Sequence, residues 1–320
     1  MISVLIVTYN SEKWISSCLE ALGRFGTGVV KEIIVVDNGS VDGTADQVRR
    51  FPAVNCTTAG RNLGFAGAIN HAARQATGDS LLILNPDCIA RTALSPLEKI
   101  LMRSENVVAV APRMVDTAGR FQRGFAIRRL PTRASLLFEI LLINRIFPRN
   151  PVNRRYRCLD FDDSREAEVE QPAGACLLVR RTTFEDIGGM DERFFPLWFE
   201  DVDLCWRLAN KAGGSILYTP SAQFEHAGAH SLDSITFSEK QIYWYRNLLY
   251  YVRKHFGWGT GLLIRAALLI GAGLRMLAEL GGMLWSRKTP AHVLSQRLRA
   301  YGRAAHLSFS TVPGGPRLGS

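Results

Sequence analysis

The sequence LLILNPD at residues 81–87 indicates the fold of this chain more clearly than any other segment. Its four leading apolar residues are too few for a helix and are typical of a strand buried on both faces of a parallel sheet. The strand should end at Asn85-Pro86-Asp87, because proline cannot extend a central ladder. We therefore expect Asp87 at the carboxyl end of a central strand, where open α/β sheets bind their ligands. A carboxylate at this position is more useful for holding a metal–phosphate ligand than for stabilising the fold.

Strand-like and helix-like runs alternate on both sides of this stretch. Over the first 120 residues we expect buried strands at 2–7, 32–36, 54–57 and 107–110, and helices at 11–22, 41–50 and 94–103. A further helix, through residue 76, should follow the glycine-rich segment 60–67. Residues 120–170 interrupt the rhythm and are interpreted as an insertion over the active-site face, with an amphipathic helix near 136–146. Strands at 175–179, 216–218 and 223–226 and helices at 182–187 and 200–211 follow. The alternation predicts a Rossmann-like, doubly wound, mostly parallel α/β sheet with right-handed crossovers.

Composition limits the class of protein. The chain has 320 residues, of which 47% are hydrophobic, so it can bury a large core and is not disordered. Its six cysteines contain no C-x-x-C pair, which fits free thiols in a reducing compartment. The first ten residues, MISVLIVTYN, lack the basic segment of a signal peptide and are interpreted as the first strand. The expected location is therefore the cytoplasm.

The net charge of +10 is concentrated in two segments. Residues 1–119 are balanced and residues 158–245 carry −9, whereas residues 120–157 carry +9 and residues 246–320 carry +10. Arginines clustered beside apolar residues indicate an anionic membrane surface or a phosphate-bearing ligand. Charge alone also allows a nucleic-acid ligand, but no nucleic-acid-binding motif is recognisable, so we expect none.

Polar residues at the ends of predicted strands are candidates for a site. Asp37, like Asp87, follows a buried strand, and two acids from different strands at one sheet edge are the geometry of a nucleotide site. Each also suits an ordinary turn or helix cap. His226 ends a strand and is either a structural histidine or a ligand. The glycine-rich stretch 60–67 either contacts a ligand or makes a tight turn into a helix.

Asp201 is a candidate general base. In a helix that starts at Glu200, Asp201 shares a face with the apolar residues, so its carboxylate is expected to point inward. Partial desolvation at a helix N-terminus suits a base, although an acid there can also simply complement the helix dipole. Asp203 and Arg207 are expected on a different face, as an exposed i,i+4 pair.

Seven motifs follow one another in a fixed order: VTYN at 7–10, VVDNGSVDGT at 35–44, GRNLGFAGAIN at 60–70, GDSLLILNPD at 78–87, GGMDERFF at 188–195, FEDVDLCWR at 199–207 and FEHAGAHS at 224–231. Over residues 1–256 the chain closely resembles the family 2 glycosyltransferases, which are inverting enzymes of the GT-A fold. Within that family it is most similar to the bacterial rhamnosyltransferase branch. The motifs are specific to the family and less specific to the sugar.

The resemblance implies which residues bind the donor. Thr8 to Asn10 would shape the nucleobase pocket, Asp37 would bond a pyrimidine, and the stretch from Asn62 would line the nucleotide and the sugar. The full set implied for the nucleotide sugar is Thr8, Tyr9, Asn10, Asp37, Asn62, Gly64, Phe65, Gly67, Asn85 and Asp87.

The resemblance also implies the chemistry. Asp87 matches the last acid of the D-x-D motif and would bind Mg²⁺ or Mn²⁺ together with His226. Asn85 replaces the first acid of that motif, so the metal should be held loosely until the nucleotide adds its phosphates. Asp201 matches the base of the E-D motif, and Glu200 would position acceptor or sugar. A single displacement would then invert the anomeric carbon.

The implied catalytic domain covers residues 1–236, with a nucleotide-sugar half at 1–119, the insertion at 120–170 and an acceptor half at 171–236. A basic helical extension at 237–310 and a flexible tail at 311–320 would follow. The implied donor is dTDP-rhamnose or another UDP- or dTDP-sugar. The acceptor would be a saccharide, lipid-linked if the chain meets a membrane, in cell-surface polysaccharide synthesis. The substitution at Asn85 also allows an inactive nucleotide-sugar-binding protein.

The leucine-rich residues 261–285 raise the question of a membrane. Arg265, Arg275 and Glu279 interrupt them and lie within about 80° of one another on a helical wheel. Three charges disfavour a spanning helix. We expect the helix either to lie in the plane of an anionic membrane at its inner face or to pack on the catalytic domain.

Overall fold

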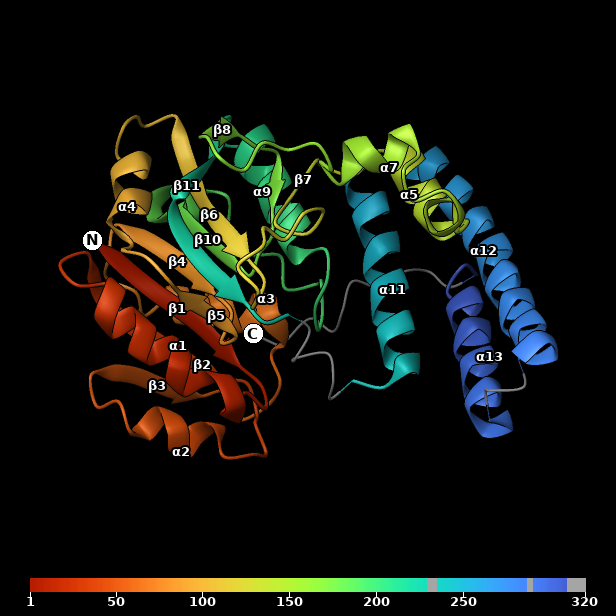
Figure 1. Ribbon diagram of the computed structural model, residues 1–320, viewed down its shortest axis with the longest axis horizontal. Helices are drawn as coiled ribbons and strands as arrows, with labels where there is room; N and C mark the ends of the chain where they lie inside the picture. The colour runs from red at the N-terminus through yellow and green to blue at the C-terminus, as the bar shows by residue number, and fades with distance from the viewer. Residues whose placement is uncertain (229–234, 287–289, 310–320) are drawn as a thin grey trace. The chain divides into compact units, whose positions relative to one another are not determined.

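The structure is a computed structural model that describes residues 1–228, 235–286 and 290–309 (Figure 1). The tail expected at 311–320 and the last residues of the FEHAGAHS motif lie outside the described residues. The chain divides into two compact units. Unit 1 comprises Met1–Leu130, Arg157–Glu192 and Glu200–Ser234, and unit 2 comprises Pro131–Tyr156, Arg193–Phe199 and Ile235–Ser320.

Unit 1 is built on a sheet with the strand order β3-β2-β1-β4-β10-β6-β11-β5. The first half of this sheet is parallel and contains β1 (Ile2–Thr8), β2 (Val30–Asp37), β3 (Val54–Thr58) and β4 (Ser80–Leu84). In the second half, β10 (Cys176–Arg180) is antiparallel to both of its neighbours, β4 and β6 (Val107–Val115). β11 (Ser215–His226) is parallel to β6. The prediction of a mostly parallel α/β sheet is confirmed.

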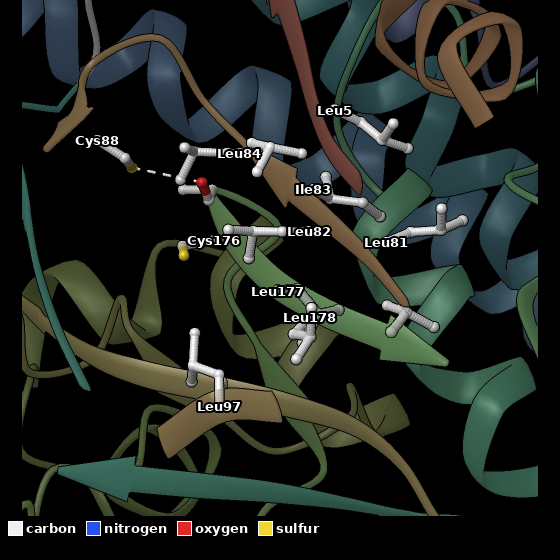
Figure 2. Packing of buried hydrophobic residues seen from close by; sticks show 14 of the residues in the cluster. Leu5, Leu81, Leu82, Ile83, Leu84, Cys88, Leu97, Cys176, Leu177 and Leu178 are labelled. Atoms are coloured by element: carbon white, nitrogen blue, oxygen red, sulfur yellow. Dashed lines mark hydrogen bonds between the residues drawn. The ribbon is translucent and has the colours of Figure 1, made fainter. Parts of the chain in front are cut away.

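Both faces of the central strands are covered, since every residue of β1 and β4 is buried. Figure 2 shows leucines of β4 beside Leu177 and Leu178 of the neighbouring strand β10 and near Leu5 of β1, all within one hydrophobic cluster. The described helices of unit 1 are α1 (Glu12–Phe25), α2 (Thr44–Arg49), α3 (Gly64–Ala73), α4 (Ser95–Leu101), α8 (Arg181–Asp186) and α9 (Glu200–Asn210). Of these, α3 packs on β1 and β2, whereas α4 packs on β6, β10 and β11.

Some elements differ from the sequence expectation. The two strands expected at 216–218 and 223–226 form one strand, β11, with an irregular register between Thr219 and Gln223, around Pro220. β5 (Cys88–Ala90) was not expected, because a three-residue strand directly after a proline turn has no clear pattern. It pairs with the end of β11. The short strands β7 (Ile127–Arg128), β8 (Ala167–Glu168) and β9 (Gln171–Pro172) complete unit 1.

Unit 2 is helical. It contains α5 (Arg133–Ile140), α6 (Ile143–Ile146), α7 (Pro151–Tyr156), α11 (Phe237–His255), α12 (Gly257–Ser286) and α13 (Ala291–His306). The helix expected at 136–146 is broken at Leu142, whose φ of 62° is left-handed. α11, α12 and α13 pack on one another, and α5 packs on α12. Among the described helices, α12 is long and apolar enough over Gly257–Gly281 to cross a membrane by length and composition.

Two bulky residues in unit 2 have an unusual backbone. Trp198 and Phe199 have φ values of 76° and 71°, a region that side chains with a Cβ rarely adopt. Asn247 of α11 is buried and donates from Nδ2 to the carbonyl oxygens of Leu197 at 2.7 Å and Trp198 at 3.2 Å. These bonds hold the strained segment in place immediately before α9 begins.

Candidate functional site

The strands β1, β2 and β4 end at the same edge of the sheet, and the loops after β1 and β2 are joined there. Thr8 at the end of β1 is paired with Asp37 at the end of β2, and its Oγ1 donates to Asp37 Oδ1 at 3.1 Å. Ser40 also donates to this oxygen, and Ser40 Oγ in turn accepts the backbone N–H of Asn10 at 3.0 Å. Asp37 is buried, whereas Tyr9 and Asn10 are half-buried. The first two motifs therefore form one structure.

The glycine-rich motif is attached to the same loops by Asn38. Its Oδ1 accepts the backbone N–H of Leu63 at 2.7 Å, and its Nδ2 donates to Asn62 Oδ1 at 3.0 Å. Asn62 Oδ1 also accepts the N–H of Gly64 at 2.8 Å, where α3 begins with a left-handed φ of 71°. Asn62, Gly64, Phe65 and Gly67 thus lie at the N-terminus of α3, close to the end of β2. Asn38 was not among the predicted residues.

Asp87 and His226 come together although they are 139 positions apart in the sequence. β5 pairs with the end of β11 so that His226 is opposite Cys88, the residue after Asp87. The two side chains are buried, and His226 Nε2 lies 3.5 Å from Asp87 Oδ2. Burial lowers the pKa of His226 below its ordinary value, and the charge of Asp87 offsets this only in part. The imidazole is therefore neutral at pH 7, the form that binds metals.

Gln122 fixes the orientation of this imidazole. Its Nε2 donates to the carbonyl oxygen of His226 at 2.8 Å, which turns its Oε1 toward His226 Nδ1 at 3.1 Å. Nδ1 therefore carries the proton, and Nε2 presents a lone pair to Asp87. Phe125 stacks on the ring, with centroids 5.0 Å apart. No local pattern marks Gln122 or Phe125, which lie in the arginine-rich segment outside every motif.

The donor atoms at this point fit a hard divalent cation. Asp87, His226 and Cys88 each offer an atom within 4.8 Å of the others. Burial raises the pKa of the Cys88 thiol well above its ordinary value, and its Sγ donates to the carbonyl oxygen of Ala175 at 3.3 Å (Figure 2). Cys88 therefore stays a thiol, which leaves a carboxylate oxygen and a neutral imidazole nitrogen as ligands. Oxygen and imidazole donors suit Mg²⁺ or Mn²⁺ better than a thiolate metal.

Asp201 lies at the same edge of the sheet. Its Oδ2 accepts the backbone N–H of Gly174 at 3.2 Å, and a Cβ on Gly174 would lie only 2.6 Å from the Asp201 Cβ. Gly174 precedes Ala175, whose carbonyl oxygen accepts the N–H of Asn85 at 2.8 Å, just after β4. The side chain is half-buried, so it is less enclosed than the helical pattern predicted.

Glu200 is the more deeply buried member of the pair. It is 7% exposed, and its Oε2 has no hydrogen-bond partner among the described residues. Burial raises the pKa of Glu200 well above its ordinary value, and the charge of Asp201 adds to this shift. Glu200 therefore keeps its proton to a higher pH than an exposed carboxyl group does, and in the protonated form it can donate a hydrogen bond.

The expectation of an exposed Asp203–Arg207 pair is wrong. Both side chains are buried, and Arg207 Nε donates to Asp203 Oδ2 at 2.7 Å. Arg207 also donates to the carbonyl oxygens of Ile187 and Gly189 at the GGMDERFF motif. The helical wheel assigned the inner face from apolar residues alone, whereas the free carbonyl groups of this turn require a buried donor. The pair ties α9 to the turn.

The GGMDERFF motif is also attached to α3. Asn70 of α3 accepts the N–H of Met190 and donates to its carbonyl oxygen, both at 2.8 Å, and donates to Glu192 Oε1 at 2.9 Å. Gly189 has a φ of 67°, and a Cβ there would lie 2.6 Å from Asn70 Oδ1. The last residue of the third motif thus positions the fifth.

Comparison with known proteins identifies the family. The family model for glycosyl transferase family 2 matches residues 3–187. This chain belongs to glycosyltransferase family 2. It is 30% identical over 297 residues to the N-acetylglucosaminyl-diphospho-decaprenol L-rhamnosyltransferase of Mycobacterium tuberculosis, a match that covers 86% of this chain and 94% of the relative. The predicted identification as a rhamnosyltransferase-like member of this family is confirmed, and the protein is a glycosyltransferase.

Solved structures agree with this fold. A mannosyltransferase from Pyrobaculum calidifontis in complex with GDP-mannose and Mn²⁺ has a TM-score of 0.54 at 17% identity and covers 97% of this chain and 88% of its own. Staphylococcus aureus TarS residues 1–349 in complex with UDP-GlcNAc has a TM-score of 0.54 at 16% identity, over 98% and 81% of the two chains. The predicted GT-A fold with a C-terminal helical region is confirmed.

The buried proton on Glu200 predicts a pH dependence of stability. In the unfolded chain this carboxyl ionises above its ordinary pKa, whereas the folded chain keeps the proton to a higher pH, because burial raises its pKa. Its contribution to the free energy of unfolding therefore falls as the pH rises above that value. Glu200→Gln removes this loss, so the variant should gain stability relative to the wild type between pH 5 and pH 8. Urea unfolding of both proteins at the two pH values measures the gain; parallel pH dependences would contradict it.

Proposed function

We propose that this glycosyltransferase moves a hexosyl group, most simply L-rhamnose from dTDP-rhamnose, onto a lipid-linked saccharide at the cytoplasmic face of the membrane. The transfer would serve the synthesis of a cell-surface polysaccharide. The observation that carries the proposal is the contact between Asp87 and His226 at the sheet edge where Asp37 and Asp201 also lie. The relative from Mycobacterium tuberculosis, aligned over most of both chains, supports the choice of sugar and of acceptor.

Asp87 Oδ2 and His226 Nε2 would hold Mg²⁺ or Mn²⁺, which supplies positive charge against the departing nucleoside diphosphate when it is bound. The neutral imidazole and the proton fixed on Nδ1 by Gln122 support this assignment. Asn85 offers only a neutral amide where the D-x-D motif has an acid. The phosphates of the donor would therefore contribute much of the affinity for the cation.

The remaining residues would hold the donor and remove a proton. Thr8 and Asp37 would hold the nucleobase, at the end of the two neighbouring strands. Asp201 would take the proton from the acceptor hydroxyl as that oxygen attacks the anomeric carbon from the side opposite the diphosphate. Hydrogen bonds from the N–H groups of Gly174 and Val202 hold the Asp201 carboxylate in position. One displacement would invert the configuration, with no covalent intermediate.

Replacement of the base should separate catalysis from binding. Asp201→Asn keeps the size and the hydrogen-bond acceptor but cannot take a proton, so we expect transfer to fall by about a thousandfold. The affinity for the donor should change little. Transfer assays with dTDP-rhamnose and a prenyl-diphosphate GlcNAc acceptor, beside donor titrations, measure both quantities.

Asp79→Asn is a matched control, since Asp79 is exposed and lies before β4, at the opposite edge of the sheet. It should leave both quantities unchanged. Full turnover by Asp201→Asn would remove Asp201 as the base. A wild-type protein that binds nucleotide sugars but neither transfers nor hydrolyses them would instead support the inactive alternative.

The metal assignment predicts a graded loss of donor affinity. Gln122→Leu frees the imidazole of His226 and should weaken Mn²⁺-dependent donor binding about 10- to 100-fold, as loss of a partner of a metal-bound histidine does. Asp87→Asn removes a charged ligand and should weaken Mn²⁺-dependent donor binding more than Gln122→Leu does. Calorimetric titration of the donor with and without Mn²⁺ measures the effect. Donor affinity that depends on Mn²⁺ equally in the wild type and Asp87→Asn would contradict the assignment.

A further inference from the structure

Charge is divided between the two units. Unit 2 contains 18 lysines and arginines and only three acidic residues, a net charge of +15, whereas unit 1 carries −5. The three acids of unit 2 have partners within that unit: Glu139 accepts from Asn144, Glu239 caps α11, and Glu279 pairs with Arg297 at 3.0 Å. The charge of unit 2 therefore favours an anionic partner of large extent.

The same unit exposes an apolar surface along α12. Of the fifteen large hydrophobic side chains that the described residues expose, eight lie on this helix, between Trp258 and Leu280. Trp258 is 81% exposed, Ile270 58% and Leu277 66%. Side chains at this spacing form a stripe along one side of a helix. Contiguous apolar stripes are rarely left to water by a monomeric protein.

The charged residues of α12 lie on its other side. Arg275 donates to the carbonyl oxygen of Ile140, the last residue of α5, at 2.6 Å, and Arg265 donates to that of Ser308, just after α13, at 2.7 Å. Glu279 pairs with Arg297 of α13. A helix on the surface of a soluble protein has the reverse arrangement, with apolar residues inward and charges outward. The outward face of α12 is thus suited to a hydrocarbon environment.

The elements that pack on α12 expose basic residues. Arg299 and Arg303 are exposed one turn apart on α13, which packs on α12. After α5, which also packs on α12, Ile146 and Phe147 are 66% and 64% exposed between Arg145 and Arg149. Apolar side chains with flanking arginines are the composition of segments that enter the headgroup region of an anionic bilayer.

We propose that unit 2 binds an anionic lipid surface, with the outward face of α12 lying in the plane of the membrane and inserted at the boundary of the acyl chains. A spanning α12 is disfavoured, because its charged side is bonded to α13 and to the end of α5, both of which carry arginines. A second copy of the chain is disfavoured as the partner, because two units of +15 would repel each other. Binding to lipid goes beyond the proposed transfer and needs neither donor nor acceptor.

The full chain should float with vesicles of phosphatidylcholine and phosphatidylglycerol, and much less with phosphatidylcholine alone. Ile270→Glu and Leu277→Glu each remove an inserted side chain and should lower the partition coefficient about tenfold or more. Arg299→Gln and Arg303→Gln should each lower it about fivefold, only on the anionic vesicles. Met102→Glu is the matched control, since Met102 is exposed in unit 1 and should leave flotation unchanged.

Circular dichroism shows whether each variant keeps the helical content of the wild type. Because two separate positions on α12 are tested, the experiment still gives a result if one of the two variants does not fold. Unchanged flotation of both folded α12 variants would overturn the proposal. The proposal would also be overturned if the wild-type protein formed a dimer that does not float and if Ile270→Glu made that dimer monomeric. Release from vesicles by alkaline carbonate supports the in-plane helix, whereas retention would overturn it. An inactive protein that still floats would count against the proposed transfer alone.

Discussion

The hydrogen-bonded position of β4 determines where the site lies. Leu84 is paired with Ile6 of β1 on one side and with Cys176 of β10 on the other, so the chain can leave the sheet only at its carboxyl edge. Pro86 then prevents further pairing, and the N–H of Asn85 is bonded to Ala175 beside Gly174. The pairing of β4 with β10 thus positions Asp87, a candidate metal ligand. It also positions the N–H of Gly174, which binds the carboxylate of the candidate base Asp201.

The second half of the site depends on contacts between distant parts of the chain. β5 carries the chain directly from Asp87 back along β11, which places His226 beside Asp87. Gln122 orients that imidazole across 104 residues of sequence. Within unit 2, Asn247 holds the strained backbone that immediately precedes Glu200. The functional groups are therefore supported by residues that take no part in the chemistry themselves.

Features that depend on a local sequence pattern could be predicted from the sequence. Features that depend on a partner residue far away in the sequence could not. The apolar run before Asn85 predicted a central strand, and the motifs predicted the family. Helical periodicity placed Asp203 and Arg207 outside, because it cannot detect carbonyl groups that a distant turn leaves to be satisfied. Gln122 carries no local signal, since an amide becomes a histidine partner only through the fold. The charged residues of α12 were evident from the sequence. The sequence did not reveal that they bond to neighbouring elements of unit 2 and that the leucines are left exposed.

The central claim is that Asp87 and His226 hold one divalent cation at the carboxyl edge of the sheet. Electron spin echo spectroscopy of Mn²⁺ bound with a nucleoside diphosphate tests it most directly, since protein labelled with ¹⁵N-histidine reports a nitrogen ligand. The account predicts a ¹⁵N coupling in the wild type that is lost in His226→Ala. Bound Mn²⁺ without such a coupling, or a coupling that survives in His226→Ala, would contradict it.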